Sequence, residues 1–183
     1  MNLALFYDTE TTGFLKKAGW DAPDQPHVVQ IAAALVDLVS RKTVASMDVI
    51  IKPDGWEVPE SASNVHGITT EEALRVGIDA PVALDMLLAL WGGGRLRVGH
   101  NEPFDAGIVG VAVTRYGPDA MLRDWRDGPG ECTMRRYADV HHCGWPKLAH
   151  AYEKLTGKPM VNAHTAMADV QACIAVYFAL VDA

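Results

Sequence analysis

A short apolar segment near the start of the chain ends in two acidic residues, and this arrangement restricts where the segment can lie in a fold. Leu3 to Tyr7 is an uninterrupted apolar run, the pattern of a buried strand. Asp8 and Glu10 follow it, and on a strand side chains two positions apart leave the same face. If the strand continues through Glu10, two like charges stand side by side at its carboxyl end. The segment is therefore either a solvated strand end or one part of a cation site.

The remainder of the chain predicts a mixed α/β sheet. Two more strands are expected at Val28 to Val39 and Val44 to Ile51, joined by a tight turn, and a short one at Leu96 to Gly99. Segments 14–27, 53–63 and 116–130 are rich in Gly, Pro or charge and are expected to be irregular. Around Cys132 we expect a short strand or the start of a helix. Helices are expected from a capping box at Thr69 with Glu72, and at Val82 to Trp91, Pro103 to Tyr116, Pro146 to Leu155 and Thr165 to Val181. Early strands followed by alternating helices and strands indicate a mixed α/β architecture.

Length and charge limit the class of protein. The 183 residues predict a single domain, residues 1–183. A net charge of −7 and a pI near 5.4 argue against a long basic track that grips many phosphates. They do not exclude a nucleic-acid enzyme whose positive charge is supplied by metal ions.

Cysteine use and hydropathy bear on the compartment. The three cysteines form no CxxC pair, and the spacing of Cys132, His141, His142 and Cys143 fits no common zinc-ligand pattern. A reducing compartment follows from this cysteine use. The sequence shows no signal peptide, and its most apolar stretches are too short or too polar to span a bilayer. We therefore expect a cytoplasmic protein that does not bind membranes.

Two further acidic residues stand in apolar helical segments. Asp105 precedes a nearly continuous apolar run, and Asp169 has apolar residues at positions +4, +7 and +11. A helix that is apolar most of the way round is buried, and a buried carboxylate must be paired, protonated or metal-bound. Each residue alone could simply stand at a helix N-terminus, where the helix dipole favours negative charge. Together with Asp8 and Glu10, they suggest a site for a hard cation.

His164 precedes Asp169 by five residues. On a regular helix this spacing separates two side chains by about 140°, so the two converge only if His164 precedes the helix and Thr165 caps it. A histidine above a metal-bound carboxylate can take a proton from water. A structural role for this histidine is the alternative.

Three motifs, FYDTETTG, HNEPFD and HTAMAD, occur in this order, and the chain resembles the DnaQ-like (DEDDh) 3′→5′ exonucleases. The segments VVQIAAALVD, NVHGIT and PKLAHAYEKLTGKPMVNAH also match that family. Thr165 stands where the related enzymes with a catalytic tyrosine carry that tyrosine, so this chain resembles the histidine variety. The resemblance implies a ribonuclease H-like fold, a mixed five-stranded sheet flanked by helices.

The resemblance also implies the site residues and the reaction. Two divalent ions, Mg²⁺ or Mn²⁺, would be held by Asp8, Glu10, Asp105 and Asp169, with His164 as the general base. Positions that contact the terminal nucleotide in the family correspond to Thr11, Thr12, Val65, His66 and Phe104. The implied activity is hydrolysis of phosphodiester bonds at the 3′ end of a single strand, with release of nucleoside 5′-monophosphates. We expect DNA as the substrate.

Two alternatives stay open at this point. One is an exoribonuclease of the ribonuclease T or oligoribonuclease type, and the other is an inactive exonuclease fold that only binds. The expected partners are 3′ ends of single strands, with a polymerase or a second copy of the chain as further candidates. The basic pairs Lys16–Lys17 and Arg135–Arg136 are either substrate contacts or solvated surface residues.

Overall fold

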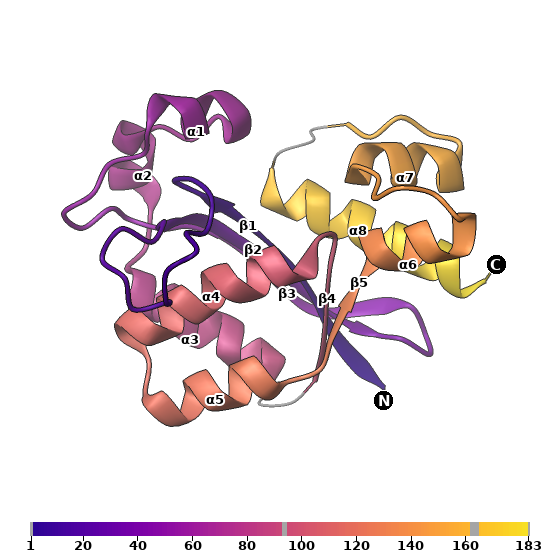
Figure 1. Ribbon diagram of the computed structural model, residues 1–183, viewed down its shortest axis with the longest axis horizontal. Coiled ribbons are helices and arrows are strands. Elements are labelled where there is room, and N and C mark those ends of the chain that lie inside the picture. The colour runs from indigo at the N-terminus through magenta and orange to yellow at the C-terminus, as the bar shows by residue number, and fades with distance from the viewer. Residues whose placement is uncertain (1, 93–94, 162–164, 183) are drawn as a thin grey trace.

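The computed structural model describes residues 2–92, 95–161 and 165–182, which form a five-stranded mixed sheet with helices on both faces (Figure 1). The strands lie in the order β3-β2-β1-β4-β5. β2 runs antiparallel to both of its neighbours, and β4 and β5 run parallel to β1. The bounds are Leu3–Thr11 for β1, Val28–Asp37 for β2, Lys42–Ile50 for β3, Leu96–Gly99 for β4 and Gly130–Cys132 for β5. The prediction of a mixed five-stranded sheet is confirmed.

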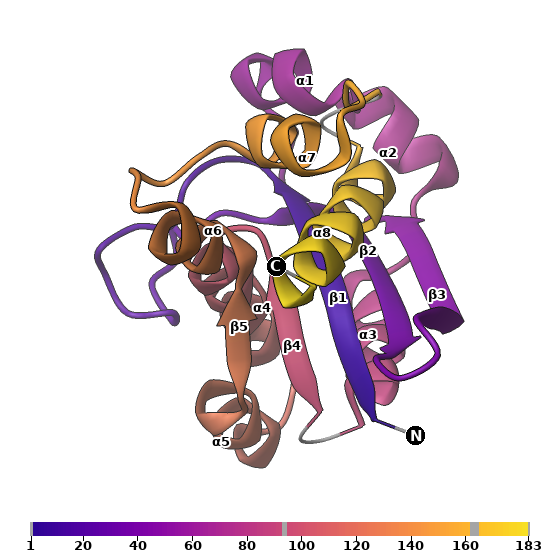
Figure 2. The same cartoon turned by 90° about the vertical axis from the view of Figure 1, so that its right-hand side faces the viewer.

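Both faces of β1 are buried, which explains its uninterrupted apolar sequence. Leu5 and Tyr7 point to one face and pack against α3 (Ala80–Trp91), α4 (Glu102–Tyr116) and α5 (Asp119–Asp127). Ala4 and Phe6 point to the other face and pack against α8 (Ala166–Val181). Figure 2 shows α8 in front of the sheet and α3, α4 and α5 behind it.

Smaller helices extend these two layers. α6 (Thr133–His141) and α7 (Leu148–Thr156) pack against α8 through a cluster that includes Tyr137, Ala151 and Val176. α1 (Glu60–His66) and α2 (Thr70–Val76) stand at the end of the sheet where β1 ends (Figure 2). The expected cap of α2 is present, since the Thr69 hydroxyl accepts a hydrogen bond from the Glu72 N–H at 3.1 Å.

Two expected irregular segments contain helices, so those predictions are wrong in part. α1 begins inside segment 53–63 and is too short to show an apolar period. α5 lies inside segment 116–130, where its apolar residues Met121, Leu122 and Trp125 occupy one side of an otherwise charged sequence. Trp125 is completely buried against Trp91, and this long-range contact stabilises a helix that local composition conceals.

The sheet topology brings several sequence motifs to the same end of the sheet. Because β1, β4 and β5 are parallel, their carboxyl ends lie at the same edge of the sheet, the usual position for ligand sites in open α/β sheets. Asp8 and Glu10 stand near the end of β1, the HNEPFD motif follows β4, and α6 follows β5. Among the described helices, none is both long and apolar enough to cross a membrane.

Candidate active site

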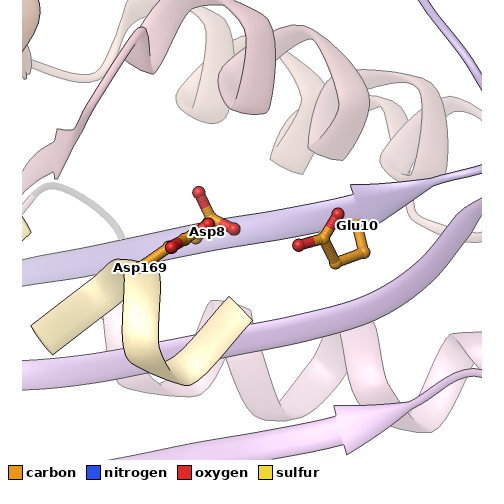
Figure 3. Close-up of side chains that lie close together, drawn as sticks. All are labelled: Asp8, Glu10 and Asp169. Atoms are coloured by element: carbon orange, nitrogen blue, oxygen red, sulfur yellow. The ribbon is translucent and has the colours of Figure 1, made fainter. Parts of the chain in front are cut away.

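The carboxyl end of β1 and the first turn of α8 bring three carboxylates together. β1 continues to Thr11, so Asp8 and Glu10 point to the same face of the sheet, the face that α8 covers. Asp169 lies in the first turn of α8. Figure 3 shows the three side chains between β1 and α8, and one oxygen from each lies within 4.8 Å of the others. The strand therefore continues through Glu10, as the first hypothesis required.

Two of these carboxylates, Asp8 and Glu10, have raised pKa values. Burial and the neighbouring carboxylates of Asp105, Asp169 and Glu10 raise the pKa of Asp8 well above its ordinary value. Burial, with Asp169 and Asp105, raises the pKa of Glu10 to about 7. None of the salt bridges among the described residues involves Asp8 or Glu10. An all-carboxylate donor set that repels itself in this way fits a hard divalent cation such as Mg²⁺ or Mn²⁺.

Asp105 reaches the cluster from the opposite face of the sheet. It lies in the first turn of α4 and is 3% exposed. Its Oδ1 atom accepts hydrogen bonds from the Thr9 N–H at 3.0 Å and from the Thr9 hydroxyl at 2.7 Å. Burial raises the pKa of Asp105 to about 7, against the opposing effect of these hydrogen bonds. Asp105 is thus fixed beside β1 without belonging to the closest group of three carboxylates.

The sequence analysis did not predict the contact between Thr9 and Asp105. Thr9 lies between Asp8 and Glu10 on the strand, so its side chain points to the other face, toward α4. Its two hydrogen bonds tie the second motif to the first across 96 positions of sequence. The strand alternation could have indicated this role, once α4 was known to cover that face.

A pocket of about 320 Å³ adjoins Glu10. Its lining includes all the residues that the resemblance associates with the terminal nucleotide, namely Thr11, Thr12, Val65, His66 and Phe104. Val65 and His66 come from α1 and Phe104 comes from α4, so helices from two separate parts of the sequence close the pocket around the end of β1. The role of these residues as substrate contacts stays a prediction.

The two threonine hydroxyls shape the turn that follows β1. Thr11 Oγ1 donates to the Gly13 carbonyl oxygen at 2.7 Å, and Thr12 Oγ1 accepts from the His27 N–H at 2.9 Å. This turn presents Phe14, which is 85% exposed and whose ring centroid lies 6.4 Å from that of Phe104. Phe14 lines the same pocket and was missed in the sequence, although it directly follows the TTG of the first motif.

The predicted general base, His164, lies outside the described residues. α8 begins at Ala166 and Thr165 is its N-cap, so His164 precedes the helix in sequence, as the hypothesis required. Its role stays a prediction.

A five-stranded mixed sheet with carboxylates gathered at the end of β1 and at the start of α8 is the arrangement of a nuclease with a ribonuclease H-like fold. The sequence matches the exonuclease family model RNase_T over residues 5–177, and the chain belongs to that family. The resemblance to the DnaQ-like 3′→5′ exonucleases and the predicted fold class are therefore confirmed.

Solved structures of exonuclease I resemble this chain over its whole length. One, described as suggesting how processivity is achieved, has a TM-score of 0.80 at 24% identity and covers 100% of this chain. E. coli exonuclease I in complex with a dT13 oligonucleotide gives 0.79 at 25% identity and the same coverage. The zinc-bound complex of the E. coli enzyme with single-stranded DNA gives 0.77 at 25% identity over 96% of this chain.

These matches cover 41%, 41% and 39% of the exonuclease I chains, so this chain spans about two-fifths of their length. No curated protein sequence matches the chain significantly.

Proposed function

We propose that this chain is a metal-dependent 3′→5′ exonuclease that removes nucleoside 5′-monophosphates from the 3′ end of single-stranded DNA. The observation that carries the proposal is the group of Asp8, Glu10 and Asp169 oxygens within 4.8 Å, next to a pocket of about 320 Å³. Membership of the exonuclease family supports the reaction class. The oligonucleotide complexes of the similar E. coli enzyme support DNA as the substrate.

Each residue of the site has a defined task in this proposal. Asp8, Glu10, Asp169 and Asp105 hold two divalent cations. Bound Mg²⁺ or Mn²⁺ supplies Lewis-acid stabilisation of the charge that develops on the phosphoryl group. Thr9 keeps Asp105 oriented through its two hydrogen bonds.

The pocket and the third motif complete the proposed site. Phe14 and Phe104 offer aromatic faces and edges against which the terminal base stacks. Val65 and His66 close the pocket from the α1 side. His164 takes the proton from the attacking water.

The direct test is digestion of a 5′-labelled single strand. We expect stepwise shortening from the 3′ end with release of mononucleotides, abolished by EDTA and restored by Mg²⁺ or Mn²⁺. Ca²⁺ accepts looser and more numerous ligands, so it should support binding but little turnover. A blocked 3′ hydroxyl should slow the reaction and a blocked 5′ end should not.

Three results would contradict parts of this function. Full activity in EDTA would eliminate the metal-dependent reaction, and cleavage of circular single strands would indicate an endonuclease. A chain that binds strands but releases nothing would be an inactive binding module. Matched DNA and RNA strands in the same assay decide between DNA and the alternative ribonuclease activity.

The division of labour in the third motif has its own test. Replacing Asp169 with Ala should lower Mn²⁺ affinity and turnover together. His164→Ala should leave Mn²⁺ affinity nearly intact and lower turnover by roughly 10²–10⁴-fold, the usual contribution of a positioned general base. Calorimetric titration with Mn²⁺ and rates of mononucleotide release measure the two effects. If His164→Ala loses metal as completely as Asp169→Ala, His164 is not the base.

A further inference from the structure

The segment from Thr133 to Lys158, which contains α6 and α7, is basic in an otherwise acidic protein. It carries five Lys or Arg residues and two acidic residues, whereas the net charge of the whole chain is −7. Three histidines add further nitrogen donors to this segment. Such a local excess of positive charge is complementary to a phosphate backbone.

The structure separates the basic residues of this segment into two groups. Arg136 is occupied within the protein, because it forms a 2.6 Å ion pair with Glu131 and donates to the Leu180 carbonyl oxygen at 3.2 Å. His150 and Lys154 are exposed and four residues apart, so they share one side of α7, and the exposed Lys147 directly precedes the helix as its N-cap. Leu148, Ala151 and Leu155 face the cluster with α8 from another side of the helix.

Trp145 stands directly before this row of basic residues. Its side chain is 68% exposed, and the Arg135 guanidinium carbon lies 5.8 Å from the centre of its ring. An exposed indole flanked by cationic side chains is the combination that single-strand-binding surfaces use, since every base offers a π-face for stacking.

Hydrogen bonds connect the Trp145 segment to the end of the sheet where the carboxyl ends of β1, β4 and β5 lie. The Pro146 carbonyl oxygen lies 3.0 Å from His100 Nε2, and His100 Nδ1 lies 2.9 Å from the Thr133 hydroxyl. Phe6 of β1 pairs with Val98 of β4, and Asp8 and His100 each stand two residues beyond that pair. Trp145 therefore directly precedes a residue that contacts His100, which follows the carboxyl end of β4. Figure 2 likewise shows α7 at the end of the sheet where β1 ends.

We propose that Trp145, Arg135 and Lys147, continued by His150 and Lys154, form a track for the nucleotides that precede the 3′-terminal residue. Trp145 stacks against one of their bases, and the basic side chains contact the phosphates. The pocket beside Glu10 grips the terminal nucleotide, and the track holds the strand on the α7 side of the carboxylates. This inference rests on the proposed exonuclease function and adds the path of the strand to it.

The test compares affinity for DNA strands of increasing length, measured in Ca²⁺ so that the strand survives. Trp145→Ala should weaken binding of a long strand by about fivefold to a hundredfold, the range found for alanine at base-stacking positions, and weaken dinucleotide binding less. Trp145→Phe should restore most of the loss, because a phenyl ring still stacks.

Salt dependence tests the phosphate contacts. Each of Arg135→Ala and Lys147→Ala should reduce the slope of log affinity against log salt by about 0.7, the value for one phosphate contact on a single strand. Lys42→Ala is the matched control, since Lys42 is an exposed lysine at the start of edge strand β3 and should leave the slope unchanged.

The outcomes separate this proposal from the function on which it rests. If the unmodified protein releases no mononucleotide, the exonuclease function fails. If it does, but Trp145→Ala, Arg135→Ala and Lys147→Ala bind long strands with unchanged affinity and salt slope, the track is overturned. The basic residues of α6 and α7 would then be better explained as a binding surface for an acidic protein.

Discussion

The surroundings of Glu102 and those of Asp8 and Glu10 differ in how they balance the negative charge of the carboxylates. Glu102, which is 7% exposed, receives its counter-charge from the protein: its Oε1 atom accepts from the Tyr7 hydroxyl at 3.0 Å and lies 3.4 Å from Arg97 Nε. Arg97 in turn donates to the carbonyl oxygens of Trp125 and Gly128, and its guanidinium lies 4.2 Å from the Trp125 ring centre. The negative charge of Glu102 is thus balanced within the protein, although the Arg97 Nε atom has no hydrogen-bond partner among the described residues.

Asp8 and Glu10 take part in none of the salt bridges among the described residues. Burial and mutual repulsion raise the pKa of both Asp8 and Glu10. Asp8 directly follows Tyr7, whose hydroxyl donates to Glu102. The contrast between Glu102, which has an ion-pair partner, and the mutually repelling Asp8 and Glu10 is consistent with the proposed cation site.

The largest expected effect comes from removing one charge of the cluster. Asp8→Asn should lower turnover by more than the 10–100-fold that is typical for residues behind the metal ligands. It should also raise the melting temperature of the protein in EDTA, because one of the repelling buried charges is gone. Mononucleotide release and thermal melting measure the two changes.

The control for this variant is Asp54→Asn, since Asp54 is exposed and forms no side-chain hydrogen bond or ion pair with another described residue. It should change neither quantity. Wild-type turnover in Asp8→Asn would remove Asp8 from the site. A lower melting temperature would show that the cluster stabilises the free protein, and the contrast with Glu102 would disappear.

Sequence reasoning identified the acidic residues of the candidate site but missed the long-range contacts that surround them, for a physical reason. Asp8 and Glu10 alternate on one strand, and Asp105 and Asp169 interrupt apolar helices, so each is visible in its own local pattern. The contacts of Glu102 with Tyr7 and of Asp105 with Thr9 span 95 and 96 positions, and no local pattern reveals which side chain a distant residue will meet.

The same limit applies to the basic pair Arg135–Arg136. In sequence the two arginines are equivalent, and their difference arises only from packing. Helical geometry turns Arg136 toward Glu131 and the end of α8, and turns Arg135 toward Trp145. Family motifs predicted the sheet, the carboxylates and the pocket lining, whereas the surface that guides the strand required the arrangement of α6 and α7.

The second expected effect concerns the buried ion pair of Glu102 with Arg97. Glu102→Ala should lower the free energy of unfolding by about 3–5 kcal/mol, because it leaves the buried Arg97 charge without its counter-ion. Glu102→Gln should cost less, since the amide oxygen can still accept the Tyr7 hydrogen bond. Urea denaturation of the three proteins measures the difference.

The exposed ion pair of Arg41 with Asp182, at 2.6 Å, is the control for burial. Asp182→Asn, which removes the charge of this pair but leaves Arg41 in place, should produce no measurable change in the urea midpoint, since exposed pairs are screened by solvent. If Glu102→Ala were as mild as this control, the buried pair would not be the stabilising element described above.

The smallest expected effect on stability comes from His27, which lies beside Arg115 and stays neutral in the folded protein at neutral pH. His27 is partly buried, its ring stacks on Trp56 with centroids 4.7 Å apart, and its Nδ1 atom lies 3.2 Å from Arg115 Nη1. Burial, with the charge of Arg115, lowers the pKa of His27 from its ordinary value of 6.5 to about 4. The folded protein therefore binds this proton only at lower pH than the unfolded chain does.

Stability should consequently fall as the pH decreases from about 6.5 to about 4, because the unfolded state binds more protons throughout that window. The contribution is fully present above pH 6.5 and is diminished by solvent screening, since His27 is only partly buried. His27→Gln should flatten this part of the stability curve measured by urea denaturation at a series of pH values, and His142→Gln, at an exposed histidine, should not. Parallel curves for the unmodified protein and His27→Gln would mean that Arg115 leaves the histidine free to ionise, and that like charges are tolerated here without an external ion.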